Sequence, residues 1–266
     1  MLGLLLLQVL ASCLCLGHSE VVTSFKTACT QFFYEKTPPG DTLRPTNAAR
    51  ICQRLSNKYH FATMYDKTRR IPVYSAYIYK PAPGNRYHSW FVEPQVNESY
   101  PKDEIEASQA GLNDYDQMSA LHRGHLSPSA PAGLNDYDQM SGLHRGHLSP
   151  NAHLSSRENK TATVTLTCMA LKDSRVNNGQ WSTYESRTTP VKTKGCTVTY
   201  FIIGAVPGNM KVANRRANRP NHICPRAIAE NDKNKVENCK PGHLEKRLTK
   251  LYGGRTTPFS KACPQQ

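Results

Sequence analysis

The chain has 266 residues, 38% hydrophobic and 20% charged, and carries a formal net charge of +14 at pH 7. That excess favours nucleic acid or an anionic surface as partner, although a solubilising charge on an extracellular protein explains it equally well. Beyond the N-terminus no stretch reaches 18 apolar residues, which argues against a membrane span. The length fits one large domain, or a domain plus a tail.

The N-terminus has the pattern of a secretory signal. The first 17 residues contain no charged side chain, and Leu4–Leu16 is mostly apolar. Such a segment is long enough for a signal-peptide core but too short to cross a membrane. Small residues at Gly17 and Ser19 favour cleavage there. We therefore expect a signal peptide over residues 1–19, a single domain over residues 20–266, and a secreted protein.

Seven cysteines follow that signal, and an oxidising compartment would pair most of them and leave at least one over. Cys29 and Cys52 lie in one short segment upstream of the first predicted strand, which favours a bridge between them. If Cys168 is the unpaired thiol, three pairings remain for the last four: Cys196, Cys224, Cys239 and Cys263. Asn97 and Asn159 begin glycosylation acceptor tripeptides, in keeping with export.

The first third of the chain predicts a helix followed by strands. Thr46 can cap a helix over 47–55. Residues 61–65 and 71–79 are rich in aromatic and β-branched residues and predict two strands, which end at the Pro- and Gly-containing stretch 81–84. Residues 91–95 read as a further short extended piece.

A near-perfect repeat occupies the middle of the chain. Residues 110–128 and 132–150 are each 19 residues long and differ only at Ala120 against Gly142. A solenoid needs at least three units, so two nearly identical copies indicate a recent tandem duplication within one fold, or an error in the gene model. One copy would occupy a site and the other would be an inserted loop, which a surface position tolerates.

The last part of the chain mixes both periodicities. Residues 161–167 alternate strictly and predict a half-buried strand with Ala162, Val164 and Leu166 inward. Residues 177–185 read as a helix, which would put Asn177, Trp181 and Glu185 on one stripe.

A strand over 198–204, closed by a turn at 206–209, follows that helix, and a late helix carries Leu244, Leu248 and Leu251 and ends at Gly253. Because strands and helices do not alternate regularly, the pattern predicts an α+β fold with an antiparallel sheet and packed helices.

Two residue types at one spacing point to a chemistry. His147 lies in an Arg-Gly-His-Leu turn, and Asn177 follows thirty positions later. An imidazole can take a proton from water near neutral pH. A neutral amide oxygen can hold a hard, mostly hydrated divalent cation without cancelling its charge. Together these groups suit hydrolysis of a phosphodiester.

On this motif, on 177–181 with Glu185, and on matching stretches at 29–33, 61–66 and 204–209, the chain resembles the DNA/RNA non-specific endonuclease family. The resemblance implies a ββα-metal (His-Me finger) site, in which a helix crosses two strands. It implies His147 as general base, Arg145 as a phosphate contact, Asn177 as the one protein ligand of a Mg²⁺, and Glu185 as an anchor for water around it. Trp181 would pack the helix, and the substrates would be DNA and RNA gripped through backbone phosphates.

The duplication leaves the catalytic copy open. His147 with Arg145 gives the compact spacing, whereas His125 with Arg123 would require a bulging loop between the two strands. The residues just before the first copy, however, resemble the family more closely than those before the second. We favour His147 and keep His125 with Arg123 as the alternative.

Departures from the family's pattern predict reduced activity. His122 and His144 replace the Asp that usually opens the motif. Cys168 replaces an Asn, and Leu171 and Lys172 replace a Pro and a Gln. A thiol cannot supply the paired donor and acceptor of an amide. Loss of such supporting groups can lower a rate without preventing folding.

Other readings remain. His144, His147 and His153 could bind zinc, although no close Cys or carboxylate completes a tetrahedral set. The chain could be a catalytically dead, cationic nucleic-acid-binding protein on a nuclease scaffold, or a disulfide-stapled interaction module. A basic group is either a set of phosphate contacts or a solvated face: Lys211, Arg215, Arg216 and Arg219.

Overall fold

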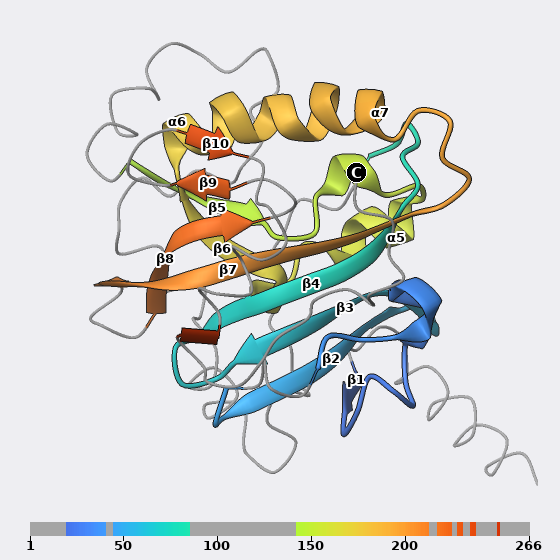
Figure 1. Cartoon of the computed structure of the whole chain (residues 1–266), viewed down its shortest axis with the longest axis horizontal. Coiled ribbons are helices and arrows are strands. Elements are labelled where there is room, and N and C mark those ends of the chain that lie inside the picture. The colour runs from blue at the N-terminus through green and yellow to red at the C-terminus, as the bar shows by residue number, and fades with distance from the viewer. Residues whose placement is uncertain are drawn as a thin grey trace, which may run out of the picture.

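The computed structural model describes residues 20–40, 45–85, 142–212, 217–224, 228–230, 235–237 and 249–250. Its centre is an antiparallel sheet in the order β1-β2-β3-β4-β7-β8-β9-β10 (Figure 1). The strands are β1 (Glu20–Val22), β2 (Ala48–Leu55), β3 (Lys58–Asp66), β4 (Ile71–Tyr79), β7 (Thr199–Val212), β8 (Ala217–Cys224), β9 (Ile228–Glu230) and β10 (Lys235–Glu237). The α+β class with an antiparallel sheet is thereby confirmed.

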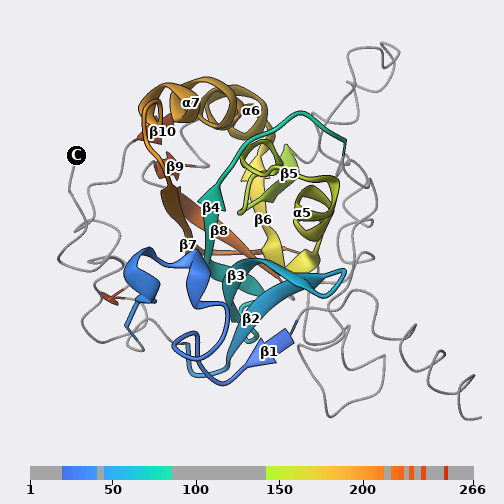
Figure 2. The same cartoon turned by 90° about the vertical axis from the view of Figure 1, so that its right-hand side faces the viewer.

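Between β4 and β7 the chain builds a second, two-stranded sheet from β5 (Leu143–His147) and β6 (Met169–Asp173). The connection between these two strands holds η5 (Asn151–His153), α5 (Arg157–Ala162) and η6 (Leu166–Cys168). After β6 a helical run follows, made of α6 (Ser174–Val176), the π-helical turns η7 (Asn177–Trp181) and η8 (Tyr184–Thr188), and α7 (Thr189–Lys192). We call the β5–β6 pair the hairpin and residues 174–192 the long helix. Figure 2 shows the hairpin, α5 and the long helix gathered beside the large sheet.

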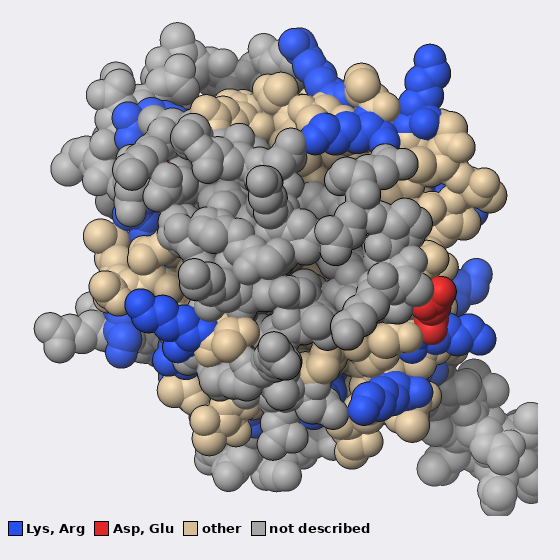
Figure 3. Space-filling model, viewed as in Figure 1, with Lys and Arg blue, Asp and Glu red and all other residues tan. Residues whose placement is uncertain are grey.

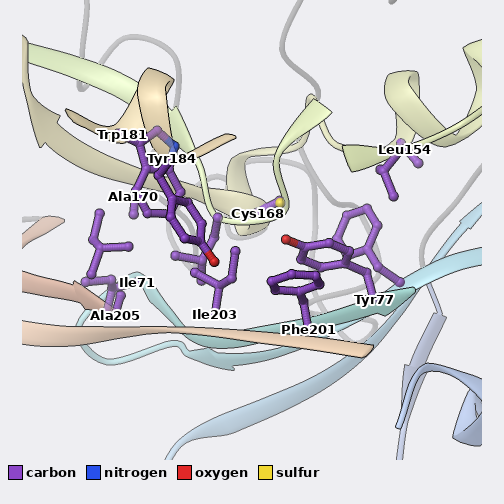
Figure 4. Packing of buried hydrophobic residues seen from close by; sticks show 14 of the residues in the cluster. Ile71, Tyr77, Leu154, Cys168, Ala170, Trp181, Tyr184, Phe201, Ile203 and Ala205 are labelled. Atoms are coloured by element: carbon purple, nitrogen blue, oxygen red, sulfur yellow. The ribbon is translucent and has the colours of Figure 1, made fainter. Parts of the chain in front are cut away.

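The large sheet has two different cores. One packs the hairpin and the long helix against β4 and β7, with Trp181, Tyr184 and Cys168 facing Tyr77 and Phe201 (Figure 4). The rings of Tyr77 and Phe201 stack at 5.6 Å. The other core lies beside the N-terminal turns η1 (Thr30–Phe32) and η2 (Tyr34–Lys36). Its buried aromatic residues are Phe25, Phe32, Phe33 and Tyr74. The disulfide lies in this second core.

The helix predicted over 47–55 is wrong, because these residues form β2. They pair with β1 on one side and with β3 on the other. Ala49 and Ile51 are buried in one small cluster, while Cys52 belongs to the core beside η1. Sheet pairing and burial on two faces override the helix propensity of Ala, Arg and Gln.

The strand predicted over 161–167 is also wrong. Ser156 caps α5 by accepting a hydrogen bond from the backbone N–H of Asn159 at 3.1 Å, and the helix runs to Ala162. Ala162, Val164 and Leu166 are buried as predicted, but so are Thr163, Thr165 and Thr167. Alternation in sequence therefore did not correspond to alternation in burial, and the strand begins later, at Met169.

Most remaining elements agree with the sequence. The strands at 61–65 and 71–79 are confirmed as parts of β3 and β4, and the helix at 177–185 is confirmed. The strand from 198 is confirmed as β7, which starts at Thr199, but the turn at 206–209 is wrong because β7 continues to Val212. There the Asn218 side chain replaces backbone pairing, accepting from Gly208 N at 2.9 Å and donating to Gly208 O at 2.8 Å.

Several predictions fall outside the described residues: the signal at 1–19, the extended piece at 91–95, the first repeat copy at 110–128, and Leu244, Leu248 and Leu251 of the late helix. The bridge between Cys29 and Cys52 is confirmed, with an S–S length of 2.06 Å. Cys168 is buried and forms no disulfide, which is the case that left Cys196, Cys224, Cys239 and Cys263 to pair. Cys196 is free and exposed, so the expectation that it joins a bridge is wrong.

Candidate active site

Strand β5 belongs to the second repeat copy and pairs with β6, which lies outside the repeat. Its register pairs His144 with Lys172, Arg145 with Leu171, Gly146 with Ala170, and His147 with Met169. All five residues of β5 are buried, including Arg145 at 5% and His147 at 6% exposure. Residues Arg123 and His125 of the other copy lie outside the described residues. The compact spacing of His147 is thus accommodated by two adjacent, fully paired strands.

The helix that follows β6 starts sharply and carries two π-helical turns. The Asp173 carboxylate caps it by accepting from the backbone N–H of Arg175 at 3.0 Å. Trp181 is buried and Asn177 and Glu185 are half-buried, while residues 178–180 and Thr183, which lie between them in sequence, are exposed. The predicted stripe therefore faces inward. π-Helical turns are rare and frequently mark functional sites.

The amide of Asn177 meets the hairpin at His144. Its Nδ2 donates to Nδ1 of the His144 ring at 3.5 Å, so this ring nitrogen must be the acceptor. Among the described residues the amide oxygen of Asn177 has no hydrogen-bond partner. His144 departs from the family's pattern, and its contact with Asn177 was not predicted from the sequence. A turn histidine on its own gives no signal for such a contact.

A buried lysine on β6, Lys172, contacts β5. Lys172 is fully buried, its Nζ donates to the backbone oxygen of His147 at 2.9 Å, and it sits 3.4 Å from the centre of the Trp181 ring. Burial lowers the pKa of Lys172 to about 7, while the negative charge of Glu185 opposes that shift. From the sequence Lys172 was recognised only as a departure from the family's pattern, not as a side chain folded into the core.

A hydrogen-bonded chain links β4 to the helix through His153. The Tyr77 hydroxyl donates to His153 Nδ1 at 2.7 Å, and His153 Nε2 donates to the backbone oxygen of Glu185 at 3.3 Å. Burial lowers the pKa of His153 to about 4 and raises that of Tyr77 well above its usual value. The ring is therefore neutral and fixes the turn that carries Glu185. Tyr77 and His153 are 76 positions apart, so no local pattern could have revealed this pair.

Charge on the surface is mostly positive where the structure describes it. Figure 3 shows Lys and Arg side chains spread around one face, with acidic side chains visible at one place. Lys211 is exposed, and Arg219 is half-buried with its Nη1 3.4 Å from the sulfur of Met210. Arg215 and Arg216 lie outside the described residues. Of the four basic residues predicted to form one group, the structure therefore describes only Lys211 and Arg219.

Within the described residues no group of three or more His, Cys, Asp or Glu side chains could hold a metal ion together. The zinc alternative also fails at His153, because both of its ring nitrogens already bond Tyr77 and Glu185. No helix in the described part of the chain is long and apolar enough to cross a membrane.

The fold and this site define a nuclease scaffold. The sequence profile of the DNA/RNA non-specific endonuclease family matches residues 38–251, and the chain belongs to that family. The family consists of divalent-metal-dependent nucleases, which are hydrolases acting on nucleic acid.

Two relatives are similar over a shorter segment. Endonuclease domain-containing 1 protein of Homo sapiens is 45% identical over 71 residues, and that of Mus musculus is 38% identical over 71 residues. In each case the match covers 26% of this chain and 14% of the relative. The resemblance inferred from the motifs is confirmed at the level of the family.

Proposed function

We propose that this chain is a secreted, Mg²⁺-dependent endonuclease that cleaves the backbones of DNA and RNA at the junction of the hairpin and the long helix, with its activity lowered by substitutions. The orientation of Asn177 carries the proposal. Because its amide nitrogen donates to His144, its amide oxygen is left to face a ligand. That oxygen belongs to the long helix, which packs on the hairpin. His147 is the last residue of β5 in the same hairpin.

A hydrated cation fits this donor set. Mg²⁺ keeps several waters and needs few protein oxygens, so a single amide oxygen suffices where no larger ligand cluster is found in the described residues. Asn177 would hold the cation, and the half-buried Glu185 would accept hydrogen bonds from water nearby. When bound, the cation would offset negative charge on the phosphate and on the departing oxygen.

His147 would act as the general base. It ends β5, three residues along the strand from His144, whose ring contacts Asn177. A neutral imidazole there accepts a proton from the attacking water. Arg145 precedes it on the same strand as the candidate phosphate contact, and its burial would strengthen the attraction because the surroundings screen charge poorly.

Substrate selection follows from charge rather than from base contacts. A net charge of +14 favours any nucleic-acid backbone, so binding should fall steeply with salt and depend little on sequence. Secretion is supported by the uncharged first 17 residues and by the Cys29–Cys52 bridge. Of the two acceptor tripeptides, Asn97 is the better candidate for a glycan, because the Asn159 side chain is engaged with Ser155 and His60.

The second candidate is a catalytically dead protein that binds nucleic acid on the same scaffold. The observation that favours it is the burial of His147, which is only 6% exposed. A base must come within hydrogen-bond reach of its water, so a permanently covered ring would bind substrate without cleaving it.

Cleavage of a supercoiled plasmid and of a single-stranded RNA distinguishes the two candidates. We expect both to be cut in Mg²⁺ and neither in EDTA. Asn177→Ala should lower cleavage by about 10²–10³-fold, because it removes the amide oxygen that would hold the cation. Asn178→Ala is the matched control, since Asn178 is exposed on the same turn, and it should cleave like the parent. Binding of both substrates without cleavage at every Mg²⁺ concentration would establish the dead scaffold instead.

A further inference from the structure

The peptide unit that joins His147 to Leu148 is held at both ends. Its carbonyl oxygen accepts from Lys172 Nζ at 2.9 Å, and its N–H donates to the backbone oxygen of Cys168 at 2.8 Å. We propose that Lys172 is a positioning residue for His147, setting the direction in which the imidazole leaves the end of β5. The proposal rests on the proposed function, in which His147 is the base.

The path of the Lys172 side chain is dictated by Gly146. A Cβ at position 146 would lie 2.4 Å from Cδ and 2.6 Å from Cε of Lys172, both too close for non-bonded carbon atoms. The lysine stem therefore occupies the space that the glycine leaves open in the strand before His147. This explains in physical terms why the Arg-Gly-His sequence has glycine at that place.

The far end of Lys172 is fixed by the helix. Its Nζ lies 3.4 Å from the centre of the Trp181 ring, a cation–π distance. Negative charge on Glu185, one turn further along, also acts on it, as does Cys168 from η6. A single amine thus ties the end of β5 to the helix that carries Asn177. If this connection is lost, the His147 imidazole and the Asn177 amide lose their common support.

Lys160 provides a matched comparison within the same chain. It too is buried, and its Nζ donates to the backbone oxygens of Ala82 and Gly84 at 2.6 and 3.2 Å. It lies on α5 and binds the segment after β4, not β5. Replacing either lysine removes a buried amine that bonds backbone carbonyls, but only the Lys172 variant releases the His147 carbonyl.

The test compares the parent with Lys172→Met, Lys172→Gln and Lys160→Met. We expect Lys172→Met to lower kcat for plasmid cleavage by about 10–100-fold at a nearly unchanged KM, because a base misplaced by about 1 Å loses rate rather than binding. Lys172→Gln keeps a donor and should recover most of the rate. Lys160→Met should leave both constants unchanged.

A second readout does not depend on cleavage. Three-bond NMR couplings report the side-chain rotamer of His147, which should be single in the parent and in Lys160→Met but averaged in Lys172→Met. A single His147 rotamer and an unchanged kcat in Lys172→Met would overturn the proposal. If the parent does not cleave at all, the proposed function fails, while the rotamer alone still decides whether Lys172 positions the ring.

Discussion

The two faces of the large sheet are covered by different types of residue. The face beside η1 and η2 is apolar and aromatic and is fastened by the Cys29–Cys52 bridge. The opposite face packs its hydrophobic residues around buried polar and charged groups, all from the segment between β4 and β7: His144, Arg145, His147, His153, Lys172 and Asp173. Burying such groups disfavours folding unless they are hydrogen-bonded. The first face therefore stabilises the fold, and the second holds the candidate site.

The largest expected effect is on stability and comes from removing the disulfide on the apolar face. Replacing both Cys29 and Cys52 by Ser should lower the free energy of unfolding by roughly 2–5 kcal/mol, because the bridge no longer restricts the unfolded chain. Cleavage per folded molecule should not change, because the bridge belongs to the core that excludes the hairpin. Urea unfolding and plasmid cleavage below the transition measure the two quantities. A loss of activity in the folded double variant would show that the faces are not independent.

The polar face should be the one that is sensitive to acid. His153 has a folded-state pKa of about 4 against 6.5 when unfolded, so its neutral form contributes fully above pH 6.5 and that contribution is lost as the pH falls toward 4. The loss amounts to about 3 kcal/mol at most.

The check is the free energy of urea unfolding at pH 7.5 and at pH 4.5. It should fall less between these values in His153→Gln than in the parent, because glutamine does not titrate. An equal fall in both proteins would mean that other groups govern the acid response.

The smallest effect concerns the support of Asn177. In His144→Asp a carboxylate would accept from the Asn177 amide more strongly than the imidazole does, and would restore the residue that usually opens the family's motif. We expect cleavage to rise about tenfold, equivalent to about 1.4 kcal/mol. His144→Asn, which is neutral, is the control and should not gain. A fall in both variants would indicate that the imidazole itself is needed.

The sequence predicted those elements whose side chains report their own surroundings. Residues 71–79 are rich in β-branched and aromatic residues and form β4, and the stripe from Asn177 to Glu185 faces inward as its spacing requires. Prediction from the sequence failed where tertiary contacts determine the secondary structure. Residues 48–55 have helix-forming composition but are paired on both edges, and residues 161–167 alternate in sequence although both sets are buried.

The site was predictable to a similar degree. His147, Arg145, Asn177 and Glu185 could be named from motif and spacing. The supports of these residues could not, because His153 and Lys172 act through partners on other elements, 76 and 25 positions away in sequence. The roles of the named residues stay predictions until cleavage is measured.

The most direct test sets the two repeat copies against each other in Mg²⁺. His147→Ala and His125→Ala each remove the same side chain from the same local sequence. We predict that His147→Ala lowers plasmid cleavage by about 10²–10⁴-fold and that His125→Ala cleaves like the parent, because only the former removes the base at the end of β5. Full activity in His147→Ala would contradict the account.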